Sequence, residues 1–248
     1  MVEDTSEALA RSFWQGRPGA TDVQDGMAGD WFIEQAMARY RALPYLTDAL
    51  MLCFADQHTP RVLEVGCGLG FDGAYLVESG AEYTGVDFPL TVLHAAKSMV
   101  VLTGSPAKWN LKSGDARALP MGDAAFDVVY SFGVLHHIPA VSAAIKEITR
   151  VLKKDGRLVA MVYNYDSIVA TAYRHDPERE GTNQPYGEGW TVPWSMADIH
   201  QLLSEDFKDL SVIYCPSAHD YVTTTSGRRM RIINDQQAYH MLVTGVKR

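Results

Sequence analysis

Short apolar runs recur along the first two thirds of the chain, and segments of mixed apolar and polar residues separate them. The clearest runs lie at residues 61–68, 82–88, 126–134 and 157–164, and a weaker one lies at 107–115. Runs of this length that end in glycine or aspartate are typical of strands buried on both faces of a parallel sheet. The pattern therefore predicts five strands in this part of the chain.

The segments between the runs carry the helical pattern. In residues 141–156 the apolar positions 141, 144, 145, 148, 151 and 152 fall on one helical face, and Gly156 follows two lysines at the end. Residues 71–80 and 89–104 also predict helices, the second with Pro89 near its start. Residues 29–56 predict helical structure that is broken once, at Pro44.

Strand and helix alternate strictly from residue 61 to residue 164, which predicts an α/β fold: a parallel sheet with helices on both faces. Residues 165–194, rich in proline, glycine and aromatic residues, interrupt this order and predict an insertion. A helix follows at 195–207 with a capping box, and 208–215 and 238–248 are the last strands. We expect a helical cap or lid at 1–57 and a main domain at 58–248, with residues 165–194 as a substrate lid.

Composition narrows the class of protein. The formal net charge of −8 argues against a broad nucleic-acid surface. The three cysteines are widely spaced, so neither a disulfide framework nor a zinc site is expected. The N-terminus lacks an apolar signal core, and no apolar run approaches the ~18 residues of a membrane span. We expect a cytoplasmic protein without a membrane or nucleic-acid partner; the oligomeric state stays open.

A glycine-rich loop, EVGCGLGFDG at 64–73, joins the first strand to the next helix. Gly68, Gly70 and Gly73 also fit the dinucleotide pattern GxGxxG, and Asp87 ends the second strand, where it could accept both ribose hydroxyls. An NAD-dependent oxidoreductase is therefore one reading. A simple chain reversal at the glycines, and a helix N-cap role for Asp87, are the structural alternatives.

The segment SGDARALPMGDAAFDVVYSFGVLHHI at 113–138 favours another reading. Together with RVLEVGCGLG and RVLKKDGRLV it resembles the class I S-adenosylmethionine-dependent methyltransferases, in the branch that holds ubiquinone and menaquinone C-methyltransferases and many small-molecule methyltransferases. The resemblance covers residues 58 to 164. It implies a Rossmann-like, seven-stranded, mostly parallel sheet with an antiparallel last strand. It also implies S-adenosyl-L-methionine as cofactor and S-adenosyl-L-homocysteine as product.

The resemblance implies a set of cofactor-binding residues. Glu64 would face the methionine amino end, together with Gly66, Cys67, Gly68 and Gly70. Asp87 would hold the ribose and Phe88 would cover the adenine. Asp115 would accept from the adenine amino group beside Ala116, and Ser131 and Phe132 would lie below the cofactor. Tyr40, in the helical cap, would meet the methionine carboxylate or is a partly buried tyrosine. Asp72 is expected to cap its helix, and Cys67 to pack.

Two adjacent histidines follow the fourth strand. Methyl transfer to a protonated acceptor needs a base, and histidine suits that task near neutral pH. The plant O-methyltransferases use a similar leucine–histidine pair as the base, so His136 is expected to act as base or to orient the substrate. His137 is expected to point the other way, as a second catalytic candidate or a hydrogen-bonded structural residue. No metal is expected, because Ser131 stands where magnesium-dependent members carry a carboxylate.

The insertion and the N-terminal helices are expected to form the substrate wall, and most of the candidate residues are aromatic, since aromatic rings bind flat or apolar molecules. The alternative is that half of these residues only pin the insertion to the domain. The candidates are Tyr163, Asn164, Tyr165, Tyr173, Tyr186, Trp190 and Trp194. We therefore expect a methyltransferase that acts on an O, N or C atom of a small molecule, with natural-product biosynthesis as one setting. The alternatives are the nicotinamide oxidoreductase and a non-catalytic cofactor-binding protein.

Overall fold

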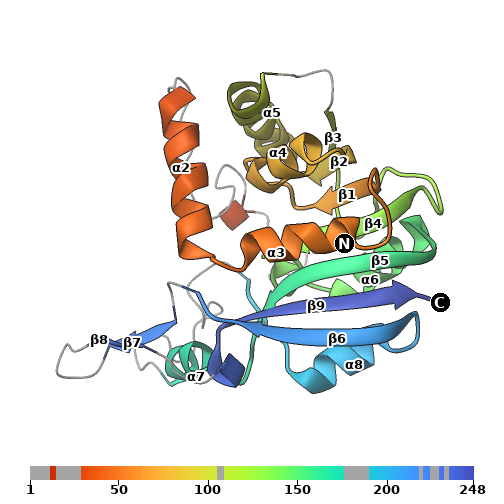
Figure 1. The fold of residues 1–248 in the computed structure, drawn as a ribbon. Helices are drawn as coiled ribbons and strands as arrows, with labels where there is room; N and C mark the ends of the chain where they lie inside the picture. The colour runs from red at the N-terminus through yellow and green to blue at the C-terminus, as the bar shows by residue number, and fades with distance from the viewer. Residues whose placement is uncertain are drawn as a thin grey trace.

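The computed structural model describes residues 12–14, 29–104, 109–175, 190–217, 220–223, 229–231 and 235–248. Its centre is a seven-stranded sheet in the order β3-β2-β1-β4-β5-β9-β6 (Figure 1). The strands are β1 (Arg61–Val65), β2 (Glu82–Asp87), β3 (Asn110–Ser113), β4 (Phe126–Phe132), β5 (Leu152–Tyr163), β6 (Phe207–Cys215) and β9 (His240–Lys247). All the predicted strands are present.

The direction of the strands matches the prediction. β3, β2, β1, β4 and β5 pair in parallel, whereas β9 runs antiparallel to both of its neighbours, β5 and β6. The predicted antiparallel last strand is therefore confirmed. The chain order reverses between β1 and β4, and ligands of open parallel sheets bind beyond the carboxyl ends of the strands at such a switch point.

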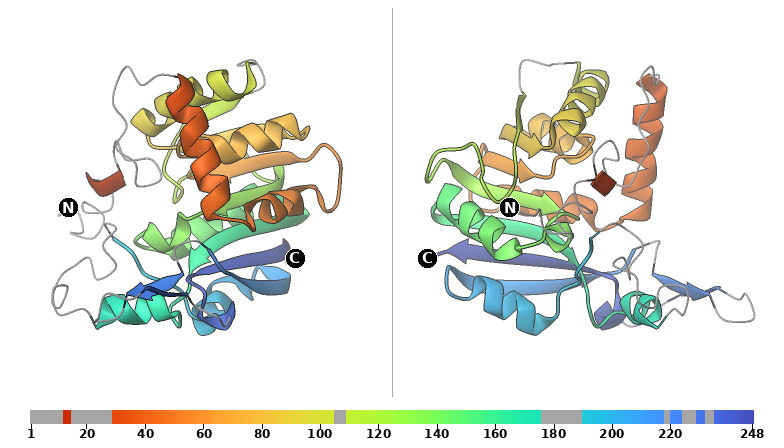
Figure 2. Two further views of the ribbon diagram at one scale, coloured as in Figure 1. Left: turned by 60° about the vertical axis from the view of Figure 1, so that its left-hand side comes forward. Right: turned by 180° about the vertical axis from the view of Figure 1, so that it is seen from behind.

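Helices cover both faces of the sheet, as Figure 2 shows. One apolar cluster joins the sheet to α6 (Val141–Val151) and α8 (Met196–Leu203). A second joins the opposite face to α3 (Leu46–Met51), η2 (Leu52–Phe54), α4 (Phe71–Glu78) and α5 (Pro89–Thr103). α2 (Gly29–Ala42) precedes α3 and contacts α5. The helical structure predicted at 29–56 is present, and it is broken at Pro44, between α2 and α3, as predicted.

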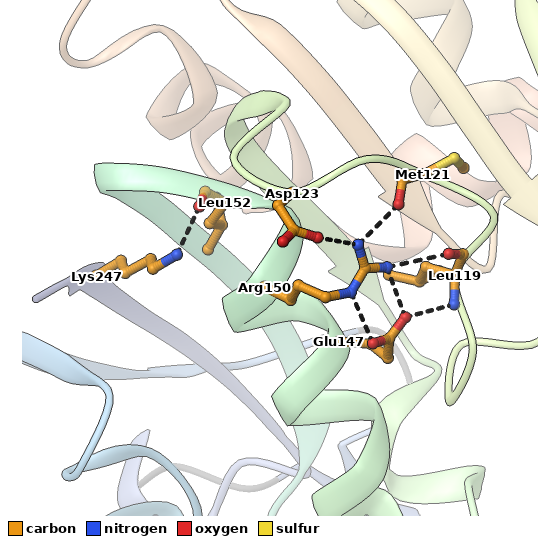
Figure 3. A network of polar contacts seen from close by, with 7 residues as sticks. All are labelled: Leu119, Met121, Asp123, Glu147, Arg150, Leu152 and Lys247. Carbon is orange, nitrogen blue, oxygen red and sulfur yellow. Dashed lines mark hydrogen bonds and ion pairs between the residues drawn. The ribbon is translucent and has the colours of Figure 1, made fainter.

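The helix predicted at residues 141–156 is shorter in the structure than that range. α6 ends at Val151, and Leu152 is already extended and pairs with Phe126 of β4. Figure 3 shows the contacts around this end: the Lys247 Nζ donates to the Leu152 carbonyl at 2.7 Å. Arg150 binds Glu147 and Asp123 and also donates to the carbonyls of Leu119 and Met121. The end of α6 is thus fixed by tertiary contacts that no local pattern records.

The insertion contains structure that the pattern did not predict. α7 (Ile168–Arg174) lies within it, and Ser167 caps this helix by accepting from the Ala170 amide.

Two further strands lie between β6 and β9, outside the insertion: β7 (Tyr221–Thr223) and β8 (Arg229–Arg231) form a small separate sheet, and η5 (Asp235–Gln237) precedes β9. The capping box between Ser195 and Asp198 at the start of α8 is confirmed. No helix in the described ranges is both long and apolar enough to cross a membrane.

Candidate active site

The two histidines and several predicted cofactor residues lie at one edge of the sheet, where β1, β2, β4 and β5 end. The short helix η4 (Leu135–His137) follows β4 at this edge. Since β9 is antiparallel to β5, its first residue, His240, pairs with Tyr163, the last residue of β5. The reversed strand therefore brings the start of β9 to the edge that carries the ends of the parallel strands.

The glycine loop has a backbone that requires glycine. Gly66, Gly68 and Gly70 have φ angles of 79°, 53° and 77°, in the left-handed region. A Cβ on Gly66 would also collide with Val134, which leads into η4. At Gly68 a Cβ would meet nothing within 4 Å, so this part of the loop faces open space.

Asp87 is brought to this loop by the parallel pairing of β1 and β2. One carboxylate oxygen accepts from the Gly68 amide at 2.8 Å, and the other accepts from the Phe88 amide at 2.7 Å. Burial raises the pKa of Asp87 to about 6, although both amides oppose this shift. The N-cap of α5 is Phe88 and no side chain caps it, so Asp87 is not the cap of this helix.

Asp72 does not cap α4, contrary to the prediction. Its buried carboxylate accepts from Arg39 Nε at 3.0 Å and from an Arg39 terminal nitrogen at 2.6 Å, and the Tyr130 hydroxyl donates to it at 2.9 Å. A buried carboxylate needs such partners, whereas an exposed cap residue does not. The guanidinium also lies 4.7 Å from the centroid of Phe132, so Arg39 ties the cap to the end of β4.

A second buried carboxylate lies beside this ion pair. Glu64 accepts from the Tyr83 hydroxyl at 2.5 Å, and burial together with the charge of Asp72 raises the pKa of Glu64. The cluster thus holds two carboxylates and the one guanidinium of Arg39. The Tyr40 hydroxyl, also buried, has no hydrogen-bond partner among the described residues. An ammonium or sulfonium group with a hydrogen-bonding neighbour suits this environment, so the residues fit the expected cofactor.

The other predicted cofactor residues lie around the same edge. Asp115 accepts from the Arg117 backbone amide and side chain, and Ala116 packs against the first apolar cluster. Ser131 is fully buried and donates to the Val65 carbonyl at 3.1 Å. Cys67 is buried in the second apolar cluster, where burial raises the pKa of its thiol.

His136 is almost completely buried, and neither of its ring nitrogens has a hydrogen-bond partner among the described residues. Its ring centroid lies 3.9 Å from that of Tyr163 and 4.2 Å from that of His137. Burial, and then the neighbouring His137 and His240, lower the pKa of His136 well below its usual value. The imidazole is therefore neutral near pH 7, with one nitrogen able to accept a proton.

His137 does not point away from His136, so that prediction is wrong. The two rings face one another, and His137 also contacts Tyr163, at 5.6 Å between centroids. Its Nδ1 lies 3.1 Å from the Trp190 carbonyl oxygen and 2.9 Å from Thr191 Oγ1. Burial lowers the pKa of His137 to about 4. Within the described ranges, no three His, Cys, Asp or Glu side chains are arranged to hold a metal ion.

Residues 63–160 match the family described as a methyltransferase domain. This match runs from β1 into β5 and covers less than half of the chain. Similar proteins include a sterol 4-C-methyltransferase of Caenorhabditis elegans, 30% identical over 46% of this chain and 33% of that protein. A demethylmenaquinone methyltransferase of Mycobacterium bovis is 33% identical over 46% of each protein. The chain thus spans less than half the length of these relatives.

A solved structure matches the whole fold. Magnesium protoporphyrin IX methyltransferase of Synechocystis, with S-adenosylhomocysteine bound, superposes with a TM-score of 0.61 at 17% identity, over 100% of this chain and 98% of that one. The predicted Rossmann-like fold is therefore confirmed.

Only some residues of the predicted substrate wall lie at the candidate site. Tyr163 packs between His136 and Tyr239, whose ring centroids lie 3.9 Å and 4.1 Å from its own. Tyr173 is half-buried beside Tyr239 and Ala170. Trp190 is half-buried and meets His137 through its carbonyl.

Three other candidates of the wall have different surroundings. Trp194 belongs to the first apolar core cluster, so its prediction as a wall residue is replaced by a packing role. Tyr165 is exposed beneath the guanidinium of Arg174. The Asn164 amide donates to the carbonyls of Gln236 and Ala238, a structural role. Tyr186 lies outside the described residues.

Residues that sequence patterns did not single out also lie at the candidate site. Tyr45 stacks with Phe132 at 6.1 Å between centroids and its hydroxyl lies 2.7 Å from His240 Nδ1. Arg39 and Tyr130 bind Asp72, as described above. No short-range signal marks any of them, because their partners come from distant strands and helices.

Proposed function

We propose that this chain is an S-adenosylmethionine-dependent methyltransferase that methylates an O, N or C atom of a small-molecule acceptor. One observation carries the proposal: a neutral, buried imidazole with unpartnered nitrogens, His136, stands at the same sheet edge as a glycine-loop site lined by the buried carboxyl groups of Glu64 and Asp72. The first group can take a proton, and the second can hold a cationic cofactor.

The cofactor would lie along the carboxyl ends of β1, β2 and β4. Glu64 and the Tyr40 hydroxyl would hold its methionine end, together with the loop of Gly66, Cys67, Gly68 and Gly70. Asp87 would accept from the ribose hydroxyls and Phe88 would cover the adenine, with Asp115 and Ala116 at its amino edge. Ser131 and Phe132 would lie beneath it. When bound, the cofactor supplies an activated methyl group on a sulfonium.

The protein's own residues contribute position and proton transfer. His136 accepts the acceptor's proton at a ring nitrogen, so that an O–H, N–H or C–H bond breaks as an N–H bond forms on the imidazole. The ring of Tyr163, tilted by 35° with its centroid 3.9 Å away, restricts the orientation of the His136 ring. Burial of this edge keeps water away from the reacting atoms, which favours the intended acceptor over hydrolysis.

The acceptor itself is proposed only as a class. Tyr163 and Trp190 contact the histidine pair, and Tyr173 packs beside Tyr239, which lies against Tyr163. Aromatic residues favour a flat or apolar molecule. Relatives are named for a sterol, for demethylmenaquinone and for a malonyl-carrier protein, so the family does not fix one chemistry. A role in natural-product biosynthesis would agree with this variety.

Calorimetric titration with S-adenosylhomocysteine, with NAD in parallel, tests the cofactor. Saturable binding of the former alone, lost in Asp87→Ala, supports the proposal; binding of NAD alone would replace it with the oxidoreductase. Phenols, quinols, amines and carboxylic acids are then screened by mass for the gain of one methyl group. A non-catalytic binding protein is favoured if the wild type binds the cofactor but methylates none of these compound classes, and His136→Ala leaves cofactor binding intact.

A further inference from the structure

The last five residues of the insertion, Trp190–Trp194, form a strap across the ends of two strands. At the middle of the strap the Val192 amide donates to the His136 carbonyl at 2.8 Å. At its last residue the Trp194 amide donates to the Tyr163 carbonyl at 2.8 Å, and the Trp194 carbonyl accepts from Tyr165 at 3.0 Å. The strap is therefore bound both to η4 and to the end of β5.

His137 is the side chain that binds the strap to η4. A carbonyl oxygen can only accept, so the Nδ1 that lies 3.1 Å from the Trp190 oxygen carries the ring hydrogen of the neutral imidazole. Thr191 Oγ1, 2.9 Å from the same nitrogen, belongs to a buried residue. Nδ1 of His137 is thus committed to the strap, whereas both nitrogens of His136 lack partners among the described residues.

We infer that the two histidines divide their work: His137 is a positioning residue that fastens the strap to η4, and through the strap and their ring contact it holds His136 in place for the acceptor. The inference rests on the proposed function for the role of His136. This arrangement explains why two histidines are adjacent. The His136 carbonyl accepts from the Val192 amide, and the His137 side chain contacts Trp190 and Thr191. Loosening the strap therefore releases the segment that carries the base.

The geometry of asparagine and glutamine gives a sharp test. The amide nitrogen of asparagine occupies the position of a histidine Nδ1, whereas that of glutamine occupies the position of Nε2. His137→Asn should keep the bond to the Trp190 carbonyl, and His137→Gln and His137→Ala should lose it. His200→Asn, on the exposed side of α8, is the matched control.

Hydrogen exchange of the Val192 amide, followed with saturating S-adenosylhomocysteine and without it, reports on the strap and needs no acceptor. We expect exchange at least about tenfold faster in His137→Ala and His137→Gln, and near wild-type exchange in His137→Asn and His200→Asn. Unchanged exchange in His137→Ala would overturn the inference. If S-adenosylhomocysteine does not bind, the result counts against the proposed function. The exchange rates measured without this ligand still test whether His137 holds the strap.

Turnover of the acceptor found in the screen separates positioning from chemistry. For a positioning role, kcat of His137→Asn should stay within about threefold of wild type, while His137→Ala loses about tenfold or more. A merely structural strap would change exchange in His137→Ala and leave kcat and KM unchanged. An active His137→Gln with an inactive His137→Asn would mean that Nε2 of His137 acts in the reaction. Either result contradicts the inference.

Discussion

The hydroxyl of Tyr45 lies 2.7 Å from Nδ1 of His240, although the two residues are 195 positions apart in the chain. Tyr45 stands at the start of α3 in the helical cap, and His240 is the first residue of β9. The bond therefore joins the cap to the last strand at the edge of the sheet that carries the histidine pair. His240 also stacks with Tyr163, so the cap is linked to the proposed acceptor site.

Removing this hydroxyl should lower stability without removing the ring. We expect Tyr45→Phe to reduce the free energy of unfolding by about 1 kcal/mol, because the largely buried hydrogen bond between Tyr45 and His240 is lost. Urea denaturation measures the change. Tyr214→Phe, on β6, is the control, since its hydroxyl makes none of the hydrogen bonds found among the described residues; an equal loss there would contradict the assignment.

The Arg39–Asp72 ion pair should be the main anchor of the cap. Arg39→Met should lower the free energy of unfolding by about 3 kcal/mol, because it leaves the Asp72 carboxylate, 3% exposed, with the Tyr130 hydroxyl but without a cation. Lys208→Met breaks an exposed pair with Asp155 and should leave stability nearly unchanged. Similar midpoints and slopes for the two variants in urea would show that the cap does not depend on Arg39.

Cofactor affinity should depend on pH through Asp87. Its pKa is raised to about 6 in the folded protein, so the carboxylate becomes protonated as the pH falls through that value. A protonated carboxyl accepts ribose hydroxyls less well, and affinity for S-adenosylhomocysteine should therefore weaken below about pH 6. Calorimetry at a series of pH values measures this; Asp87→Asn should bind weakly and lose the dependence.

The same shift affects folding with a definite sign. The pKa of Asp87 is higher in the folded than in the unfolded chain, where it is 3.8. Its stabilising contribution is therefore complete below the unfolded value and is lost as the pH rises toward about 6. Comparing denaturation of wild type and Asp87→Asn at about pH 4 and pH 7 checks this, and a wild-type advantage that grows with pH would be the opposite of the expected result.

His136→Ala should lower kcat by more than about tenfold and leave the affinity for S-adenosylhomocysteine nearly unchanged, since the base acts on the acceptor and not on the cofactor. Single-turnover kinetics with the acceptor from the screen, alongside calorimetry, separates the two quantities. Unchanged turnover would rule out His136 as the base.

The activity of the wild type should persist as the pH is lowered from about 8 to 6. Burial and the nearby His137 and His240 lower the pKa of His136, so the imidazole stays neutral across this range. The measurement is kcat at saturating cofactor, which removes the expected effect of Asp87 on binding. A fall in kcat centred near the ordinary histidine pKa would show that His136 is not buried as described.

The sequence by itself determined the alternation of strands and helices, the glycine loop and the acidic residue that follows the second strand. These are local: buried strands need apolar runs, positive φ angles need glycine, and a helix start at Ser195 needs its partner three residues away at Asp198. Residues 61–164 were therefore assigned nearly correctly, and the two histidines were placed at the correct edge.

Only the tertiary structure decided the partners of the buried charges and rings. The roles of Asp72 and His137 depend on Arg39 and on Trp190, which approach from other elements. Trp194 was placed in the wall because its type suits an acceptor, but the core encloses it. His240 lies at the site because β9 runs antiparallel to β5. Local patterns encode neither the order of the strands in the sheet nor the desolvation of buried polar groups. Strand order decides which residues are neighbours, and desolvation decides which buried polar groups need a hydrogen-bond or ionic partner.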